Sequence, residues 1–294
     1  MIRIATRGSK LALTQAGQVA EMLGGAELVE ASSDGEPGDK SRFVRGVERA
    51  LLAGEADVGV HSAKDLPGEA AAGLQIAAVP PREDPADVWI GAGTSLEDVA
   101  EGARVGTASL RRRAQLLALR PDLRVEELRG NVDTRLRKLA EGELDAIVLA
   151  AAGLRRLGRA DEIGFAIPAA QMVPAPGQGS LALQVRSDDS ATSEAVMAIG
   201  ETRALRELTA ERVAVAPLGA SCSSPLGVHA RVIDGERLEI EAFVGLPDGS
   251  EWLRDRIEGD ATDPGTAGLR LAERLLGAGA RELLERAAAL GGPA

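Results

Sequence analysis

Short apolar stretches alternate with longer amphipathic stretches along the first part of the chain. Runs of β-branched and aliphatic residues predict strands, and apolar positions repeated every three or four residues predict helices. The predicted strands cover 2–5, 27–31, 57–61, 74–79 and 88–91, and the predicted helices cover 11–23 and 43–53. This alternation predicts an α/β fold with mixed, mainly parallel sheets.

The middle of the chain repeats this order of elements. Strands are predicted at 104–107, 124–128 and 145–149, with helices at 110–119 and 132–140 between them. The segment Pro174-Ala-Pro-Gly-Gln-Gly179 is too rich in proline and glycine for a helix, and a strand is predicted directly after it at 181–185. We expect the chain to cross at this segment between two α/β units.

The C-terminal part has a different pattern. A helical pattern at 193–215 leads into a loop at 216–225, and a final helix is predicted at 265–290. Between them, alternating strands at 228–233, 238–244 and 252–257 are joined by Asp-Gly pairs, which are typical of hairpin turns. The sequence therefore predicts a small third α+β domain. We assign 1–81 and 178–197 to domain 1, 82–177 to domain 2 and 198–294 to domain 3.

Composition and charge exclude several classes of function. The chain has 2% aromatic residues and no tyrosine, so it lacks most of the stacking surfaces that single-stranded nucleic acid needs. Its formal charge of −11 argues against a general polyanion binder. One cysteine and two histidines exclude an intrachain disulfide and argue against a metal centre. We therefore expect neither a nucleic-acid partner nor a metal.

The location of the protein is inferred from its apolar and charged segments. The chain contains no run of about 18 apolar residues, the length that a membrane span requires. Arg3 and Arg7 interrupt the first apolar residues, which is unlike a signal peptide. We expect a cytoplasmic protein with no membrane partner.

A basic stretch stands out in this acidic chain. Residues 104–138 contain ten basic and four acidic side chains, a local surplus of six positive charges. Arg111 and Arg112 follow a strand-to-helix turn that carries Thr107 and Ser109, and the amide groups at such a helix start favour an anion. A second turn, bracketed by Arg129 and Arg135, repeats the arrangement. These features predict a cleft for a ligand with several carboxylates or phosphates, unless the arginines merely solvate helix faces.

Other candidate residues lie at the ends of predicted strands. Lys64 and Asp65 follow the strand at 57–61; they are either a solvated turn or an anion anchor and a general acid/base. Arg7 and Ser9 end the first strand and would face the same crevice. Cys222 lies in a Gly/Ser/Pro loop, where it is either a small buried residue or a nucleophile.

The two histidines do not point to catalysis. Neither His61 nor His229 forms a recognisable dyad pattern with Cys222. We therefore assign both histidines structural roles.

Taken together, these motifs resemble the hydroxymethylbilane synthase family, also called porphobilinogen deaminase. Any one motif is weak, but all of them occur in the order of the family and span nearly the whole chain. They lie at 4–9, 56–67, 105–112, 128–135, 149–158 and 174–179, followed by the Cys222 loop.

The resemblance implies a fold and a chemistry. The fold would have two lobes like those of a type II periplasmic binding protein, with the site between them, and a small third domain. Cys222 would carry a covalent dipyrromethane cofactor. The reaction would be a transferase step of tetrapyrrole and heme biosynthesis, in which four porphobilinogen molecules are condensed with loss of ammonia and the linear product is released by hydrolysis. We expect the protein to act as a monomer.

The resemblance also implies roles for individual residues. Asp65 would be the catalytic carboxylate. The cofactor would be held by Lys64, Thr107, Ser109, Arg111, Arg112 and Arg129, and the substrate by Arg7, Ser9, Gln15, Arg135 and Arg156. Each porphobilinogen carries two carboxylates, so the local surplus of arginines suits this chemistry.

Three departures from the family pattern bear on the site. The segment at 32–43 is short and lacks a Gly-Gly-Lys-Gly pattern, so Lys40 is the match for its lysine and closure of a lid is left open. Ala108 stands where the family commonly has serine, and Leu218-Gly-Ala-Ser-Cys222 replaces Leu-Glu-Gly-Gly-Cys.

The alternative function is a non-catalytic, two-lobed binding protein for a small polycarboxylate, which would give no role to Cys222 or Asp65.

Overall fold

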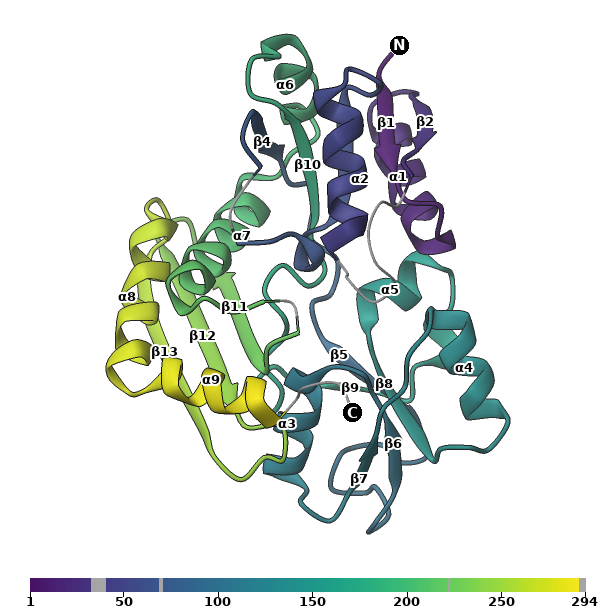
Figure 1. Ribbon diagram of the computed structural model, residues 1–294, viewed down its shortest axis with the longest axis vertical. Helices are drawn as coiled ribbons and strands as arrows, with labels where there is room; N and C mark the ends of the chain where they lie inside the picture. Colours follow the sequence, from purple (N-terminus) through teal and green to yellow (C-terminus); the bar gives the residue numbers. More distant parts are fainter. Residues whose placement is uncertain (33–40, 69–70, 222, 291–294) are drawn as a thin grey trace.

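The computed structural model describes residues 1–32, 41–68, 71–221 and 223–290, and it describes Ser41, Arg42 and Phe43 by their backbone only. Lys40, most of the short segment before Phe43, and Cys222 lie outside the described residues. The described chain forms two five-stranded sheets and one three-stranded sheet. Figure 1 shows the first sheet at the top, the second at the bottom and the third at the left.

The first sheet has the strand order β2-β1-β3-β10-β4. Its elements are β1 (Arg3–Thr6), α1 (Lys10–Met22), β2 (Glu27–Glu30), α2 (Ser41–Leu52), β3 (Val58–Ser62), β4 (Leu74–Ala78), β10 (Leu181–Arg186) and α6 (Ser190–Met197). β1 pairs in parallel with β2 and β3, whereas β10 pairs antiparallel with β3 and β4. Leu181 through Val185 are all buried, which explains why this strand is a continuous apolar run broken only by Gln184.

The second sheet has the equivalent order, β7-β6-β8-β5-β9. Its elements are β5 (Asp87–Gly91), β6 (Arg104–Gly106), α3 (Leu110–Leu119), β7 (Arg124–Glu126), α4 (Val132–Ala140), β8 (Ala146–Ala150), α5 (Ala151–Arg156) and β9 (Phe165–Ile167). β6 pairs in parallel with β7 and β8, and β5 pairs antiparallel with β8 and β9. Each of the two sheets thus contains a parallel β-α-β-α-β unit. The next strand in the sheet, β10 or β5, runs antiparallel to that unit, and the edge strand, β4 or β9, runs antiparallel to this strand in turn.

The third sheet is antiparallel and carries helices on one side. Its elements are α7 (Thr202–Val215), β11 (Leu226–Val232), β12 (Arg237–Gly245), β13 (Trp252–Asp260), α8 (Pro264–Gly277) and α9 (Ala280–Leu290). The inward side chains of the sheet and the buried faces of these helices form one apolar core, which includes Val228, Ile240 and Leu271. In Figure 1, α8 lies at the left edge of the molecule and α9 crosses the lower part of this sheet toward α3.

The α/β class with mixed sheets is confirmed, but parallel pairing does not dominate. Each five-stranded sheet has two parallel and two antiparallel pairings. The physical reason is connectivity. β10 enters the first sheet from the second unit, and β5 is reached from the first unit, so neither strand follows a right-handed helical crossover that would make it parallel.

Two segments join the sheets, at 79–86 between β4 and β5 and at 168–180 between β9 and β10. The predicted crossing at 174–179 is therefore confirmed. Gly177 has φ +72° and Gly179 has φ +89°, a region that L side chains rarely adopt. A Cβ at Gly177 would lie 2.9 Å from the backbone of Lys64, so the glycine allows this segment to pack directly on the turn after β3.

Two long predicted helices are each split. The pattern at 193–215 becomes α6 and α7, and the interruption includes Gly200, where a Cβ would lie 3.2 Å from that of Ala78. The pattern at 265–290 becomes α8 and α9, separated at Gly279, whose φ is +96°. The short elements α5 and β9 were not predicted. No described helix combines the length and apolar character needed to cross a membrane.

Candidate active site

A cavity of about 560 Å³ lies where the carboxyl ends of strands in both five-stranded sheets meet the third unit. Its lining comes from the turns after β1, β3 and β6, from the start of α3 and from α4, from the 174–179 segment, and from α7 and the loop that follows it. Six cationic side chains and one carboxylate line its described part: Arg7, Lys64, Arg111, Arg112, Arg135, Arg212 and Asp65. This composition suits a ligand with several negative charges.

The start of α3 presents two arginines to the cavity. Ser109 is the N-cap residue, and its Oγ accepts a hydrogen bond from the backbone N–H of Arg112 at 3.4 Å. Ser109 N–H in turn donates to Thr107 Oγ1 at 3.2 Å. The two hydroxyls therefore fix the turn, and the first helical residues carry Arg111 and Arg112 into the lining.

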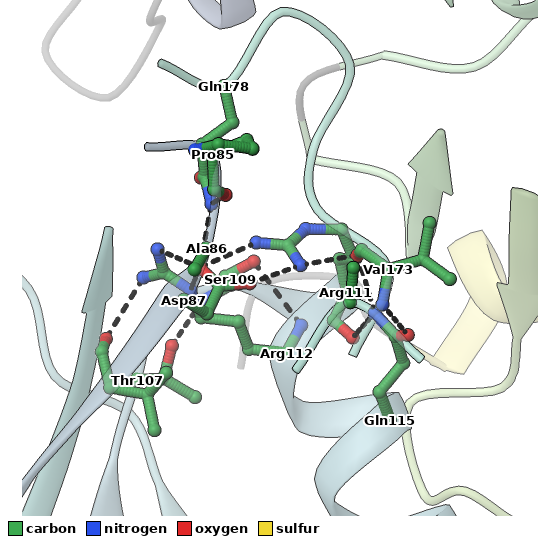
Figure 2. Close-up of polar contacts among 12 residues, drawn as sticks. Pro85, Ala86, Asp87, Thr107, Ser109, Arg111, Arg112, Gln115, Val173 and Gln178 are labelled. Carbon is green, nitrogen blue, oxygen red and sulfur yellow. Dashed lines mark hydrogen bonds and ion pairs between the residues drawn. The ribbon is translucent and has the colours of Figure 1, made fainter. Parts of the chain in front are cut away.

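A buried carboxylate stands behind these arginines (Figure 2). Asp87 is fully buried, and its oxygens lie 2.7 and 3.2 Å from the terminal nitrogens of Arg111. Arg112 reaches the same carboxylate at 2.9 Å through Nε and at 2.8 Å through Nη2. Burial opposes ionisation of Asp87, but Arg111 and Arg112 outweigh it and hold the pKa of this carboxyl well below its usual range.

The turn after β3 carries a lysine and the lining carboxylate. Lys64 Nζ lies 3.3 Å from Gln178 Oε1, and Asp65 lies 3.4 Å from Arg7 Nη1. Burial, reinforced by the nearby Arg112, lowers the pKa of Lys64 to about 8. The Lys64 charge can therefore titrate near neutral pH, whereas the arginines keep theirs.

Two further cations line other parts of the cavity. Burial and the charge of Arg112 lower the pKa of Arg135 to about 10, so its guanidinium is partly desolvated yet charged at neutral pH. Arg212 of α7 donates to the carbonyl of Gly68 at 2.9 Å, and burial lowers its pKa. In the loop after α7, Ser221 and Ser223 line the cavity on either side of position 222.

Seven of the site residues expected from the sequence line this cavity: Arg7, Lys64, Asp65, Ser109, Arg111, Arg112 and Arg135. Thr107 is buried beneath the α3 turn, and Arg156 is half-buried and donates to the carbonyl of Gly179 at 2.7 Å. Arg129 is exposed and paired with Glu127 at 2.6 Å. Cys222 lies outside the described residues.

The other two expected residues are in the first unit. Ser9 accepts a hydrogen bond from the N–H of Ala12 and caps α1. Gln15 is buried, and its amide nitrogen lies 2.9 Å from Ser62 Oγ. Neither residue is part of the cavity lining as described, and their roles remain predictions.

Most of the basic stretch at 104–138 does not face the cavity. Of its ten basic side chains, all of them described, only Arg111, Arg112 and Arg135 are in the lining. Other members form ion pairs elsewhere: Arg104 with Asp145, Arg120 with Asp122, Arg129 with Glu127, Arg137 with Glu141 and Lys138 with Glu143. Of these five basic residues, only Arg137 and Lys138 lie on a helix, α4, so the interpretation that they solvate helix faces applies to these two.

The histidines contact buried polar groups outside the cavity lining. His61 Nε2 lies 3.0 Å from Gln184 Oε1, and burial lowers the pKa of His61 to about 4. His229 Nδ1 lies 3.4 Å from Glu211. No group of three or more potential metal ligands occurs among the described His, Asp and Glu residues.

Sequence reasoning missed three residues of the site: Asp87, Gln178 and Arg212. Gln178 lies within the 174–179 segment. The proline and glycine content of that segment predicts a crossing between units but does not indicate a role for the Gln178 side chain. Asp87 opens a strand whose next residues are buried, and a carboxylate at such a position is the signal that could have revealed it. Arg212 carries no local signal, because it reaches the cavity only through the packing of α7.

Similarity to solved structures is low. The chain has a TM-score of 0.41 and 15% identity to the second substrate binding domain of a putative amino acid ABC transporter from Streptococcus pneumoniae, covering 67% of this chain and 90% of that one. A TRAP periplasmic solute binding protein from Desulfovibrio salexigens gives a TM-score of 0.40 at 11% identity, covering 68% and 72%. We base no argument on scores of this size.

Sequence similarity is much higher. Two family models match, described as "Porphobilinogen deaminase, dipyromethane cofactor binding domain" over residues 2–194 and "Porphobilinogen deaminase, C-terminal domain" over residues 205–277. The porphobilinogen deaminase of Thermus thermophilus is 44% identical, covering 97% of this chain and 98% of that protein. That of Pelotomaculum thermopropionicum is 45% identical, covering 97% and 96%. The chain therefore belongs to the porphobilinogen deaminase family.

Proposed function

We propose that the chain acts as a hydroxymethylbilane synthase and that the cavity is where it joins four porphobilinogen molecules. The observation that carries this proposal is the lining itself, which combines six cations with the single carboxylate of Asp65. Every substrate molecule brings an acetate and a propionate. A chain of such units needs many fixed cations and one group that handles protons at the reacting carbon.

The residues present fit the dipyrromethane cofactor that the family model names. Two pyrrole units carry four carboxylates. The lining has six cations, and two carboxylates offset them, Asp65 in the lining and Asp87 behind it. This leaves a surplus of four positive charges. Ser221 and Ser223 line the cavity beside position 222, which supports attachment through the Cys222 thiol. When bound, the cofactor supplies the pyrrole carbon to which the first substrate is joined.

Asp65 is proposed to act on the substrate. Loss of ammonia breaks the C–N bond of the substrate's aminomethyl arm and leaves a cationic azafulvene, with charge shared by the pyrrole nitrogen. A carboxylate beside that nitrogen stabilises the developing charge and can pass protons to and from the reacting centre. The contact of 3.4 Å to Arg7 Nη1 orients the Asp65 side chain from the neighbouring turn.

The carboxylate side chains of the ligands are proposed to bind the remaining cations. For the cofactor we assign Lys64, Thr107, Ser109, Arg111, Arg112 and Arg129, and for the substrate Arg7, Ser9, Gln15, Arg135 and Arg156. Neither Arg129, which is exposed, nor Thr107, which is buried, belongs to the described lining, so these two assignments rest on the family motifs. The proposed domains are 1–81 with 178–197, 82–177, and 198–294, and sheet membership supports them. We further propose a cytoplasmic monomer.

The intact mass of the denatured protein tests the proposal. The wild type should carry an excess equal to two deaminated porphobilinogen units, and Cys222→Ser should lack it. The wild type should also convert porphobilinogen to products that cyclise to uroporphyrins. A bare polypeptide mass that stays bare with porphobilinogen, together with equilibrium binding of a small dicarboxylate, would favour a two-lobed binding protein instead.

A further inference from the structure

Asp87 lies outside the cavity lining but contacts three residues that form it. It is fully buried at the first position of β5 and accepts hydrogen bonds from Arg111, Arg112 and Gln178. Figure 2 shows these side chains converging on its carboxylate. Asp87 is thus placed to act on a ligand through its neighbours, not by touching the ligand.

The two guanidiniums need this carboxylate because they are adjacent and buried. Arg111 and Arg112 have side-chain exposures of 4% and 7%, so water screens their repulsion poorly. Each also donates to a backbone carbonyl, Arg111 to Val173 at 2.8 Å and Arg112 to Val148 at 3.0 Å. With these contacts made on one side, each guanidinium still has N–H groups left for a ligand carboxylate.

The Asp87 carboxylate also connects Arg111 and Arg112, which form the floor of the cavity, to the turn that carries Asp65. Gln178 donates through Nε2 to Asp87 at 3.0 Å, and its Oε1 faces Lys64 Nζ at 3.3 Å. Gln178 belongs to the segment that joins the two sheets, while Lys64 precedes Asp65. A polar chain therefore runs from the start of α3 in the second unit to the turn after β3 in the first.

We propose that Asp87 is a positioning residue that orients Arg111 and Arg112 toward ligand carboxylates and ties them, through Gln178, to the Lys64–Asp65 turn. This inference rests on the proposed function, since it assigns Asp87 a part in carboxylate recognition at that site. Asp87 also limits the positive charge of the floor, which keeps the surplus of the cavity matched to a ligand with four carboxylates.

The test compares holoenzyme variants. Asp87→Asn keeps the shape of the side chain and removes the charge, and Asp87→Glu keeps the charge but shifts it by one methylene. The matched control is Asp57→Asn, because Asp57 also pairs with an arginine, Arg3 at 2.7 Å, but lies before β3 and away from the cavity. For each protein we would measure the intact mass, the melting temperature, and kcat and KM for porphobilinogen well below that temperature.

We expect Asp87→Asn either to raise KM by roughly tenfold or more or to be purified folded but without cofactor. Asp87→Glu should retain cofactor and show a smaller rise in KM. Asp57→Asn should lower the melting temperature with full cofactor loading and an unchanged KM. Should Asp87→Asn fail to fold, the rise in KM of Asp87→Glu relative to the Asp57→Asn control decides the question.

A pH profile separates positioning from simple destabilisation. Lys64 faces the charges of Asp65, Asp87, Arg111 and Arg112, and the charge of Asp87 favours the protonated amine. Removing that charge in Asp87→Asn should move the alkaline rise of KM to lower pH, whereas Asp57→Asn should leave its position unchanged. Full cofactor loading with wild-type KM and pH profile in both Asp87 variants would overturn the proposal. Lack of turnover by the wild type would instead overturn the proposed function.

Discussion

Asp65 is the one carboxylate in the described lining of a cavity that is otherwise cationic. Its side chain is 40% exposed and contacts Arg7, so the fold does not depend on it. We expect Asp65→Ala to keep its cofactor and its melting temperature, while kcat falls by roughly 10²–10⁴-fold, the usual contribution of a positioned acid/base group. Single-turnover kinetics and the intact mass of the same sample check this.

Asp145 offers a matched control for Asp65. It is 49% exposed and also paired with an arginine, Arg104 at 2.9 Å, but it precedes β8 and so lies at the edge of the second sheet opposite the cavity. Asp145→Ala should leave kcat unchanged. A kcat in Asp65→Ala close to that of Asp145→Ala would remove Asp65 from the catalytic role.

Lys64 makes carboxylate binding depend on pH. Burial and Arg112 lower the pKa of Lys64 to about 8, so its positive charge is present below that pH and lost above it. Lys64 adjoins Asp65, where we place the reacting substrate, so loss of the Lys64 charge should also raise the KM for porphobilinogen between about pH 7 and pH 9. In Lys64→Arg the guanidinium stays charged across this range, and the rise should disappear. Identical pH profiles for the two proteins would show that another group controls binding.

At the scale of elements, one buried ion cluster fastens the third unit to both connecting segments. Glu211 of α7 is fully buried and accepts hydrogen bonds from Arg82 at 2.8 Å, from the N–H of Gly177 at 2.6 Å and from the N–H of Ala230 at 2.8 Å. Arg82 lies in the 79–86 segment and Gly177 in the 168–180 segment. Burial opposes ionisation, but Arg82 and His229 hold the pKa of Glu211 below its usual range.

Glu211→Gln removes the nearer carboxylate partner of Arg82 and leaves this buried charge with only the longer contact of 3.5 Å to Glu207. The free energy of unfolding should fall by about 3–5 kcal/mol. Urea denaturation followed by circular dichroism measures this change. Glu273→Gln, at an exposed position of α8, should change the free energy by less than about 0.5 kcal/mol, and an equal loss in both variants would contradict the role given to Glu211.

The sequence predicts elements well where local signals agree. The helix at 110–119 matches α3 residue for residue, because Ser109 caps its start and Pro121 lies just beyond its end. The split between α8 and α9 was missed because alanine and leucine continue the helical pattern across Gly279, although its φ of +96° ends the helix. β10 runs antiparallel to its neighbours in the first sheet, and β5 does the same in the second. Both orientations follow from long-range connectivity, which the periodicity of the sequence does not encode.

The site was predictable at strand ends and not beyond them. Arg7, Lys64, Asp65, Arg111 and Arg112 follow strands in the sequence, and the fold brings these turns together at one cavity. Asp87 meets Arg111 and Arg112 through packing within the second unit, whereas Gln178 and Arg212 reach the site through packing between units. Local sequence spacing carries no information on such contacts.

At the scale of the whole molecule, the charge of the cavity opposes that of the chain. The protein carries −11 overall, yet its cavity holds a surplus of positive side chains. A ligand with carboxylates is therefore attracted only near the cavity, where the arginines are close together and partly screened from water. Uncompensated, the same charges repel one another and destabilise the folded state.

This repulsion predicts how cofactor loading affects stability. Cys222→Ser, without cofactor, should melt roughly 5 °C or more below the wild type, because the cavity loses the anions that bind only the folded protein. Citrate, a tricarboxylate, should raise the melting temperature of Cys222→Ser more than that of the wild type, whose cations are already engaged. Sodium chloride at the same ionic strength separates specific binding from screening. Equal responses of both proteins to citrate would mean that the surplus of positive charge does not control stability, and that the three units are held together by contacts such as those of Glu211 alone.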